Sequence, residues 1–228
     1  NDKLEKVFEH YIGKIIYYEK PQVNQEILVK IYKFDMKHDK YITVINKYTK
    51  EAQLPTMISN ITELVERNEF VTNLISECRQ EKERKVLVLS DRLEHLDFLK
   101  ERVDSLNIGT TSKYIGGMKQ VKLDEAEEAD IIFSTYSMSS EALDISTLNT
   151  VILSTSRRNV EQSVGRILRK QKGNYIVQPL VIDIVDSLKP MANQSYGRKS
   201  YYKKITKLEN IENYQYKNGE VEFIETKK

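Results

Sequence analysis

The sequence predicts an α/β fold with a mainly parallel sheet covered by helices on both faces. Short apolar runs suited to buried strands alternate with segments of helical periodicity, an order typical of parallel sheets. At 228 residues the chain is long enough for one large or two small domains with a full core. The 36 Lys and Arg nearly balance the 34 Asp and Glu, so composition alone does not indicate a nucleic-acid-binding protein.

The elements follow in order along the chain. A half-exposed strand is expected at 26–34, where apolar and charged residues alternate. Phe70, Leu74 and Cys78 recur every four residues and predict a helix over 66–81. Further strands are expected at 85–90, 111–115, 129–135, 149–155 and 175–185, with helices around 96–103 and 160–170. Residues 35–57 are too polar to assign.

Several classes of site are excluded by residue type. One cysteine, Cys78, rules out an internal disulfide, and its place on the helical stripe indicates a core position. The three histidines lack ligand spacing, so no metal site is expected, and His95 is expected at the surface. The acidic run 124–130 follows no apolar strand and is interpreted as a solvated helix end. No apolar run reaches the roughly 18 residues of a membrane span, so no membrane partner is expected. The protein is expected to be intracellular.

The strongest chemical pattern lies between residues 162 and 169. On a helix, Gln162, Arg166 and Arg169 share one face. Two guanidinium groups on one face repel each other unless an anion lies between them, and their forks match phosphate oxygens. Gly165 allows another backbone or a ligand to approach closely. The alternative is a solvated basic face paired with carboxylates such as Glu161.

The segment QSVGRILR at 162–169 resembles the Q-x-x-G-R-x-x-R signature of superfamily 2 helicases, their sixth motif. KVLVLSDR at 85–92 is similar to the fourth motif, and STYSMSSEALDI at 134–145 is similar to the fifth. YIGG at 114–117 resembles the glycine turn that these enzymes place against a nucleic-acid backbone. The match is most similar to helicases of large DNA viruses and to double-stranded-DNA-tracking helicases. It covers roughly residues 85–185 and implies a RecA-like three-layer fold, the second motor domain of a two-domain helicase.

The resemblance implies a role in ATP hydrolysis for each matching residue. Arg166 and Arg169 would be arginine fingers that reach the γ-phosphate of ATP bound to the first RecA-like domain. Gln162 would contact the same nucleotide or the attacking water. Asp144 would accept a hydrogen bond from the ribose or couple the two sites; a turn or helix-capping aspartate is the alternative. Ala142 stands where the family usually has glycine.

A second group of residues is expected to contact the nucleic-acid strand that is tracked. Hydroxyls at a strand end can bind phosphate without adding charge, and a Gly-Gly pair can expose successive N–H groups, although an ordinary turn is the alternative. The expected nucleic-acid-binding residues are Ser90, Arg92, Gly116, Gly117, Lys119, Ser134 and Thr135. Phosphate contacts carry no base readout, so little sequence preference is expected. DNA is the expected substrate, with RNA as the alternative.

The resemblance also suggests domain boundaries. Residues 1–34 are expected to be a remnant of the first RecA-like domain and linker, 35–190 the second RecA-like domain, and 191–228 a basic, tyrosine-rich tail. No acidic residue occurs from Ser187 to Leu208, and lysines alternate with tyrosines there. Such a tail would bind phosphates and stack on bases; the alternative is a basic arm that packs against another domain.

The phosphate loop G-x-x-x-x-G-K-[ST] does not occur in the sequence. ATP with Mg²⁺ is therefore expected to be bound mainly by the first RecA-like domain, the partner of this chain in the full-length protein, and the isolated chain is expected to be inactive. A non-catalytic RecA-like module that docks other proteins remains the alternative from a different functional class.

Overall fold

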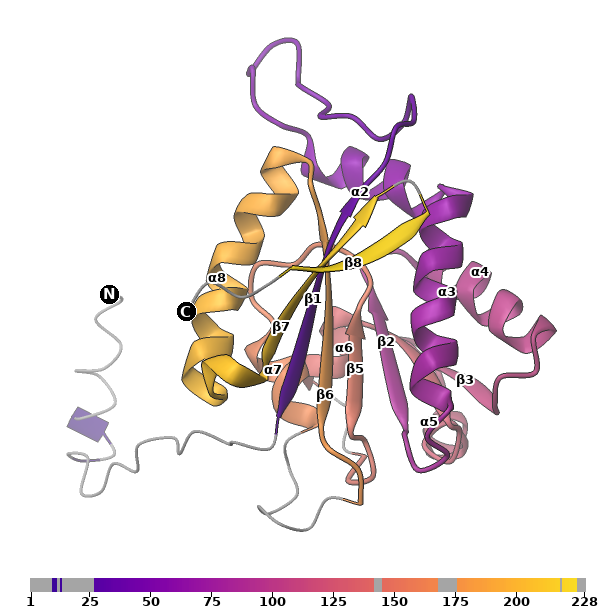
Figure 1. Ribbon diagram of the computed structural model, residues 1–228. Helices are drawn as coiled ribbons and strands as arrows, with labels where there is room; N and C mark the ends of the chain where they lie inside the picture. The colour runs from indigo at the N-terminus through magenta and orange to yellow at the C-terminus, as the bar shows by residue number, and fades with distance from the viewer. Residues whose placement is uncertain are drawn as a thin grey trace.

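The computed structural model describes residues 10–11, 13, 27–141, 145–167, 176–217 and 219–224. An eight-stranded sheet in the order β3-β4-β2-β5-β6-β1-β7-β8 forms the centre, with α3 and α4 on one side and α8 on the other (Figure 1). All of its pairings are parallel except that between β7 and β8. This confirms the predicted α/β fold with a mainly parallel sheet.

The strands are β1 (Leu28–Asp35), β2 (Val86–Ser90), β3 (Thr111–Tyr114), β4 (Ile131–Thr135), β5 (Thr150–Leu153), β6 (Leu180–Asp186), β7 (Ile211–Lys217) and β8 (Glu220–Ile224). The helices are α2 (Leu54–Thr62), α3 (Val65–Arg79), α4 (Leu93–Ser105), α5 (Gln120–Ala126), α6 (Tyr136–Glu141), α7 (Glu161–Arg166) and α8 (Lys189–Ile205). The continuous apolar runs became β2, β4, β5 and β6, whose residues are nearly all buried because helices cover both faces.

The expected domain boundaries differ from the structure at both ends. Strand β1 pairs in parallel with β6 and with β7, so residues 28–34 lie inside the sheet rather than in a remnant of another domain. Beyond residue 191, α8, β7 and β8 continue the same fold rather than forming a tail. The lysines of β1 gave its sequence the pattern of a half-exposed strand, although the strand lies inside the sheet. Lys30 lies over the Tyr214 ring, 6.0 Å from its centroid, while Lys33 is exposed.

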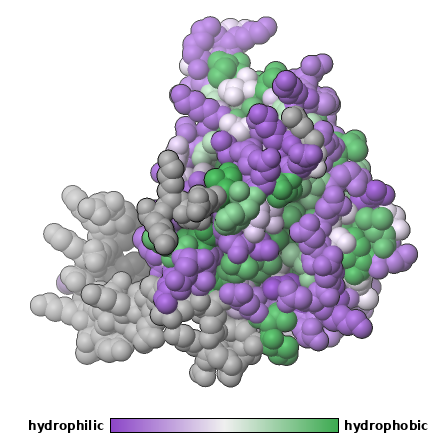
Figure 2. All heavy atoms as spheres, in the orientation of Figure 1, coloured by the Kyte–Doolittle hydropathy of each residue, from purple (hydrophilic) through white to green (hydrophobic). Residues whose placement is uncertain are grey.

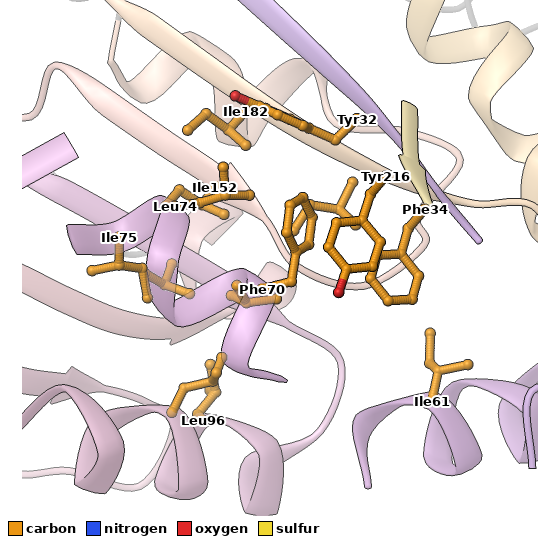
Figure 3. Close-up of a cluster of buried hydrophobic side chains, with 14 of the residues drawn as sticks. Tyr32, Phe34, Ile61, Phe70, Leu74, Ile75, Leu96, Ile152, Ile182 and Tyr216 are labelled. Carbon is orange, nitrogen blue, oxygen red and sulfur yellow. The ribbon is translucent and has the colours of Figure 1, made fainter. Parts of the chain in front are cut away.

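Two apolar clusters, one on each face of the sheet, form the core. On the α3 face, the Phe70 ring lies 4.5 Å from that of Tyr216 and 5.4 Å from that of Phe34 (Figure 3). Each fully buried side chain of this size contributes about 1.5–3 kcal/mol to folding. The predicted helical stripe that includes Phe70 is confirmed, and Cys78 is buried in the same cluster. Burial raises the pKa of the Cys78 thiol to about 12, so it is protonated at neutral pH.

Strand β6 is fixed to both helical layers by buried ion pairs. On one face, Arg67 of α3 bonds Asp186 through two N–H groups, each 2.8 Å from a carboxylate oxygen. On the other face, Arg198 of α8 bonds Asp183 at 2.8 Å, and the Tyr202 hydroxyl donates to the same carboxylate at 2.9 Å. Burial opposes the charge of Arg198, but the adjacent Asp183 carboxylate raises the pKa of Arg198 above its usual value. Arg198 and Tyr202, expected in a nucleic-acid-binding tail, are therefore core residues.

Candidate functional site

The carboxyl ends of three adjacent strands bring most of the expected nucleic-acid-binding residues to one edge. In the sheet register, Ser90 of β2 lies opposite Thr135 of β4, and Ser134 lies opposite Tyr114 of β3. The Gly116–Gly117 turn follows β3 directly. Chemistry in parallel sheets gathers at such carboxyl ends.

Two of the expected hydroxyls, those of Ser90 and Ser134, are buried and bonded within the protein. The Ser134 hydroxyl donates to the Tyr114 carbonyl at 2.6 Å. The Ser90 oxygen lies 2.9 Å from Nδ1 of His95 and accepts a hydrogen bond from the Arg92 backbone N–H at 3.1 Å. Both serines are fully buried, so they support the turns at this edge and do not present hydroxyls to a ligand.

The accessible groups at this edge are few. Gly116 and Gly117 are exposed, and Gly117 has a φ of +82°, which L side chains rarely adopt. Lys119, at the start of α5, is also exposed. The Thr135 hydroxyl is half-buried and lies 3.3 Å from that of Ser137. These groups offer backbone N–H, one hydroxyl and one cation, which is a donor set suited to phosphate.

Arg92 lies beside this edge and contacts α2. Its guanidinium donates to the Ser59 hydroxyl at 3.0 Å and to the Pro55 carbonyl at 2.7 Å. In the part of the chain that the structure describes, no carboxylate pairs with it, so the full positive charge remains near the β2 turn.

His95 is a correction to the expectation of a surface residue. It is fully buried, and its Nε2 lies 3.1 Å from the Asn68 amide oxygen, so the Ser90–His95–Asn68 chain joins β2, α4 and α3. Burial, with a smaller contribution from Arg67, lowers the pKa of His95 to about 3, so the imidazole is neutral. This arrangement has the residue types of a nucleophilic triad, but its complete burial makes it a structural network. The sequence spacing gave no sign of the Asn68 partner.

Helix α7 carries Gln162, Gly165 and Arg166 next to α6. Gln162 is exposed, and the half-buried Arg166 donates through Nη2 to the Ser140 carbonyl at 2.5 Å. The Ser139 and Ser163 hydroxyls lie 2.9 Å apart and link the two helices. A methyl group added at Gly165 would meet nothing within 4 Å, which leaves open space beside Arg166. Among the described residues Arg166 has no carboxylate partner. Asp144 and Arg169 lie outside the described residues.

An ion pair links the loop after β2 to the loop that leads into α7. Arg157 lies 3.3 Å from Asp91, and the Asp91 N–H donates to the Thr155 hydroxyl at 3.0 Å. The Arg157 guanidinium also lies over the Tyr136 ring, 5.7 Å from its centroid. Burial raises the pKa of the Asp91 carboxyl, an effect that Arg157 and then Arg92 oppose. Direct contacts therefore join the loop after β2, which holds Arg92, to the loop that leads into α7.

Two proteins of large DNA viruses are similar in sequence to this chain. The chain is 37% identical over 208 residues to a protein of Acanthamoeba polyphaga mimivirus whose name describes an ATP-dependent RNA helicase, covering 89% of this chain and 40% of that protein. A protein of African swine fever virus with a similar name is 37% identical over 90 residues, covering 39% of this chain and 18% of that protein. The chain thus spans less than half the length of these relatives. No family model matches it.

Solved structures agree on the fold. T4 UvsW superposes with a TM-score of 0.63 at 17% identity, covering 84% of this chain and 42% of that one. The C-terminal domain of the DEAD-box protein Dbp5 superposes with a TM-score of 0.52 at 12% identity, covering 67% of this chain and 84% of that domain. This chain therefore has a RecA-like fold of the kind found in helicase C-terminal domains, and its sequence is similar to those of the two viral proteins. The expected resemblance is confirmed.

The names of the viral relatives imply ATP, which is usually bound with Mg²⁺. One short helix presents the cation of Arg166, which has no carboxylate partner in the part of the chain that the structure describes, and the amide of Gln162. This donor set fits the terminal phosphate of a nucleotide approached from outside the domain. Within the described ranges no group of acidic, histidine or cysteine side chains could hold a metal ion. In the same ranges no helix is long and apolar enough to cross a membrane.

Proposed function

We propose that this chain is the C-terminal half of an ATP-dependent superfamily 2 helicase or translocase. The observation that supports this most directly is the Asp91–Arg157 ion pair. It joins the loop after β2, which lies beside the end of β4, to the loop that leads into α7. A first RecA-like domain would be the partner and would hold most of the nucleotide. The viral relatives, named as ATP-dependent RNA helicases, support the same assignment.

In this proposal Arg166 and Arg169 act as arginine fingers. The Arg166 bond to the Ser140 carbonyl orients the guanidinium and leaves other N–H groups for phosphate oxygens. Gln162, four residues earlier on the same helix, would contact the nucleotide or the attacking water, and Asp144 the ribose. ATP with Mg²⁺ would supply the phosphoanhydride bond to be hydrolysed. Closure of the two lobes would bring both arginines to the γ-phosphate, and reopening would move the nucleic-acid surface relative to the first lobe.

On the nucleic-acid surface, Gly116 and Gly117 N–H groups, the Thr135 hydroxyl, Arg92 and Lys119 would contact phosphates. Ser90 and Ser134 would hold the turns that carry these groups. Such contacts carry no base readout and fit DNA and RNA equally, so little sequence preference is expected. The resemblance of the sequence to double-stranded-DNA-tracking helicases favours DNA, whereas the names of the viral relatives favour RNA.

The finger assignment is tested by the ATPase rate of the full-length protein that contains this chain. Arg166→Ala is expected to lower kcat by about 10³–10⁵ while nucleic-acid affinity is retained. Arg158→Ala is the matched control, since Arg158 is an exposed arginine in the loop before α7. A loss below tenfold for Arg166→Ala would contradict the finger role. The isolated chain is expected to show no ATPase activity above its Arg166→Ala/Arg169→Ala double variant.

The choice of nucleic acid is tested by competition. Duplex DNA, single-stranded DNA and RNA of matched sequence would each displace a labelled DNA strand from the protein. Displacement by DNA at the lowest concentration would support the DNA substrate, and displacement by RNA at a lower concentration would replace it with RNA. A full-length protein that shows neither nucleic-acid binding nor ATPase activity would indicate a docking module instead.

A further inference from the structure

A groove of about 600 Å³ lies between α8 and the side of the sheet formed by β1 and β7. Three lysines line it, Lys33 of β1 and Lys189 and Lys199 of α8. Helix α8 lies on the opposite side of the sheet from α3, near the β8 edge (Figure 1). On the face seen in Figure 2, the coloured hydrophobic side chains occur in patches among hydrophilic ones.

The charged side chains that line the groove are lysines. Among the described residues, no acidic side chain lines it and none of the three lysines pairs with a carboxylate. Lys189 and Lys199 are ten residues apart on α8, which corresponds to about 15 Å along a helix. At the duplex rise of 3.4 Å per nucleotide, that length spans about four nucleotides. Three ammonium groups spread over this length suit a chain of phosphates better than a single anion.

The remaining lining favours a nucleic-acid strand over an acidic peptide. Tyr196 is 70% exposed and presents a flat ring of the kind on which bases stack. The amides of Asn193 and Asn213 add hydrogen-bond donors and acceptors for base edges or sugar hydroxyls. An acidic peptide would use the same lysines but would not need an exposed ring.

We propose that this groove binds the phosphate backbone of a nucleic-acid strand, as a second contact separate from the surface after β3 and β4. Four strand spacings separate β4 from β1 in the sheet order, which places the two surfaces about 19 Å apart. The proposal rests on the proposed function only in taking a nucleic acid as the ligand. DNA and RNA share the phosphodiester chemistry, and the probes distinguish them.

The test measures binding of the full 228-residue chain to fluorescent dT and rU oligonucleotides over a range of salt concentrations. Removal of the three groove lysines by Lys33→Gln, Lys189→Gln and Lys199→Gln is expected to weaken binding about tenfold. It should also lower the slope of log K against log salt by about 2, since each phosphate contact on a single strand contributes about 0.7. The control removes three exposed lysines elsewhere, Lys37, Lys47 and Lys82, and should leave the slope unchanged.

The proposed stacking of bases on the Tyr196 ring is tested by Tyr196→Leu, which is expected to weaken oligonucleotide binding at least about fivefold. Tyr48→Leu is the control, since Tyr48 is 94% exposed in the loop before α2.

Unchanged affinity and slope in the groove variant would overturn the proposal, as would binding of poly-glutamate in place of oligonucleotide. A Lys119→Gln/Thr135→Val variant separates the two surfaces. If the Lys119→Gln/Thr135→Val variant loses affinity for the oligonucleotides and the groove variant does not, the groove proposal is overturned and the proposed function stands. If the groove variant loses affinity and the Lys119→Gln/Thr135→Val variant does not, the groove proposal is supported.

Discussion

The two halves of the sheet place polar groups in opposite ways. In β6, the carboxylates of Asp183 and Asp186 are completely buried, and each is held by a buried arginine from a covering helix. At the ends of β3 and β4, the accessible groups are a glycine pair, a half-buried hydroxyl and an exposed lysine. The first half is a fixed frame, whereas the second exposes backbone and hydroxyl groups that remain available to a ligand.

The frame also positions the candidate site. Arg67 donates a further hydrogen bond, 2.8 Å long, to the Ser154 carbonyl at the end of β5, where the loop toward α7 begins. The same guanidinium therefore joins α3, β6 and this loop. A charged network buried in the frame can fix the direction of a loop that an apolar contact would leave less defined, although it contributes little net stability.

The largest expected effect comes from breaking the frame. Arg67→Leu leaves the Asp186 carboxylate buried without a partner and should lower the free energy of unfolding by about 3–5 kcal/mol in urea titrations. Arg102→Leu is the matched control on the surface, because its ion pair with Glu69, 2.9 Å long, is partly exposed and should cost no more than about 1 kcal/mol.

The double variant Arg67→Leu/Asp186→Leu distinguishes an unpaired charge from lost packing. With both charges removed, most of the stability should return. If Arg67→Leu lowers the free energy of unfolding no more than Arg102→Leu does, the distinction between a fixed frame and an open edge is contradicted.

The second comparison concerns pH, because the buried titratable group beside the end of β2 is the neutral His95, whereas those of β6 are carboxylates paired with arginines. The pKa of His95 is about 3 in the folded protein, against about 6.5 in an unfolded chain, so the unfolded state binds the extra proton between these values. The His95 contribution is thus fully present above pH 6.5. It is lost as the pH falls, at up to about 1.4 kcal/mol per pH unit.

Urea unfolding of wild type and His95→Asn from pH 4 to 8 measures this contribution. The wild type should lose its advantage over the variant below pH 6.5, while His38→Gln, a change at an exposed histidine, should leave the acid dependence intact. Parallel curves for wild type and His95→Asn would show that the imidazole does not control the acid stability of this half.

The contrast also explains what the sequence could and could not predict. Buried strands were found because their apolar runs are continuous, as in β2 and β4. Whether a serine at a strand end faces solvent or a helix depends on tertiary packing, so Ser90 and Ser134 could not be separated from Thr135. A signal was present in β6: two acids three residues apart in an apolar run need buried partners, and opposite strand faces need two different helices. That signal would have placed Arg198 in the core.

The smallest effect concerns the open space beside Arg166. Gly165→Ala adds a methyl group that meets nothing within 4 Å and should stabilise the chain alone by up to about 1 kcal/mol, since alanine favours a helix over glycine. Gly109→Ala is the contrasting control: its methyl group would lie 3.2 Å from the Asp130 carboxylate and the Arg79 side chain, which would have to shift, so it should stabilise less than Gly165→Ala. If a partner lobe closes on α7, Gly165→Ala should lower the ATPase rate of the full-length protein despite its higher stability. An unchanged rate would show that the space at Gly165 remains open when the lobes close, and that the contact surface of this half lies elsewhere.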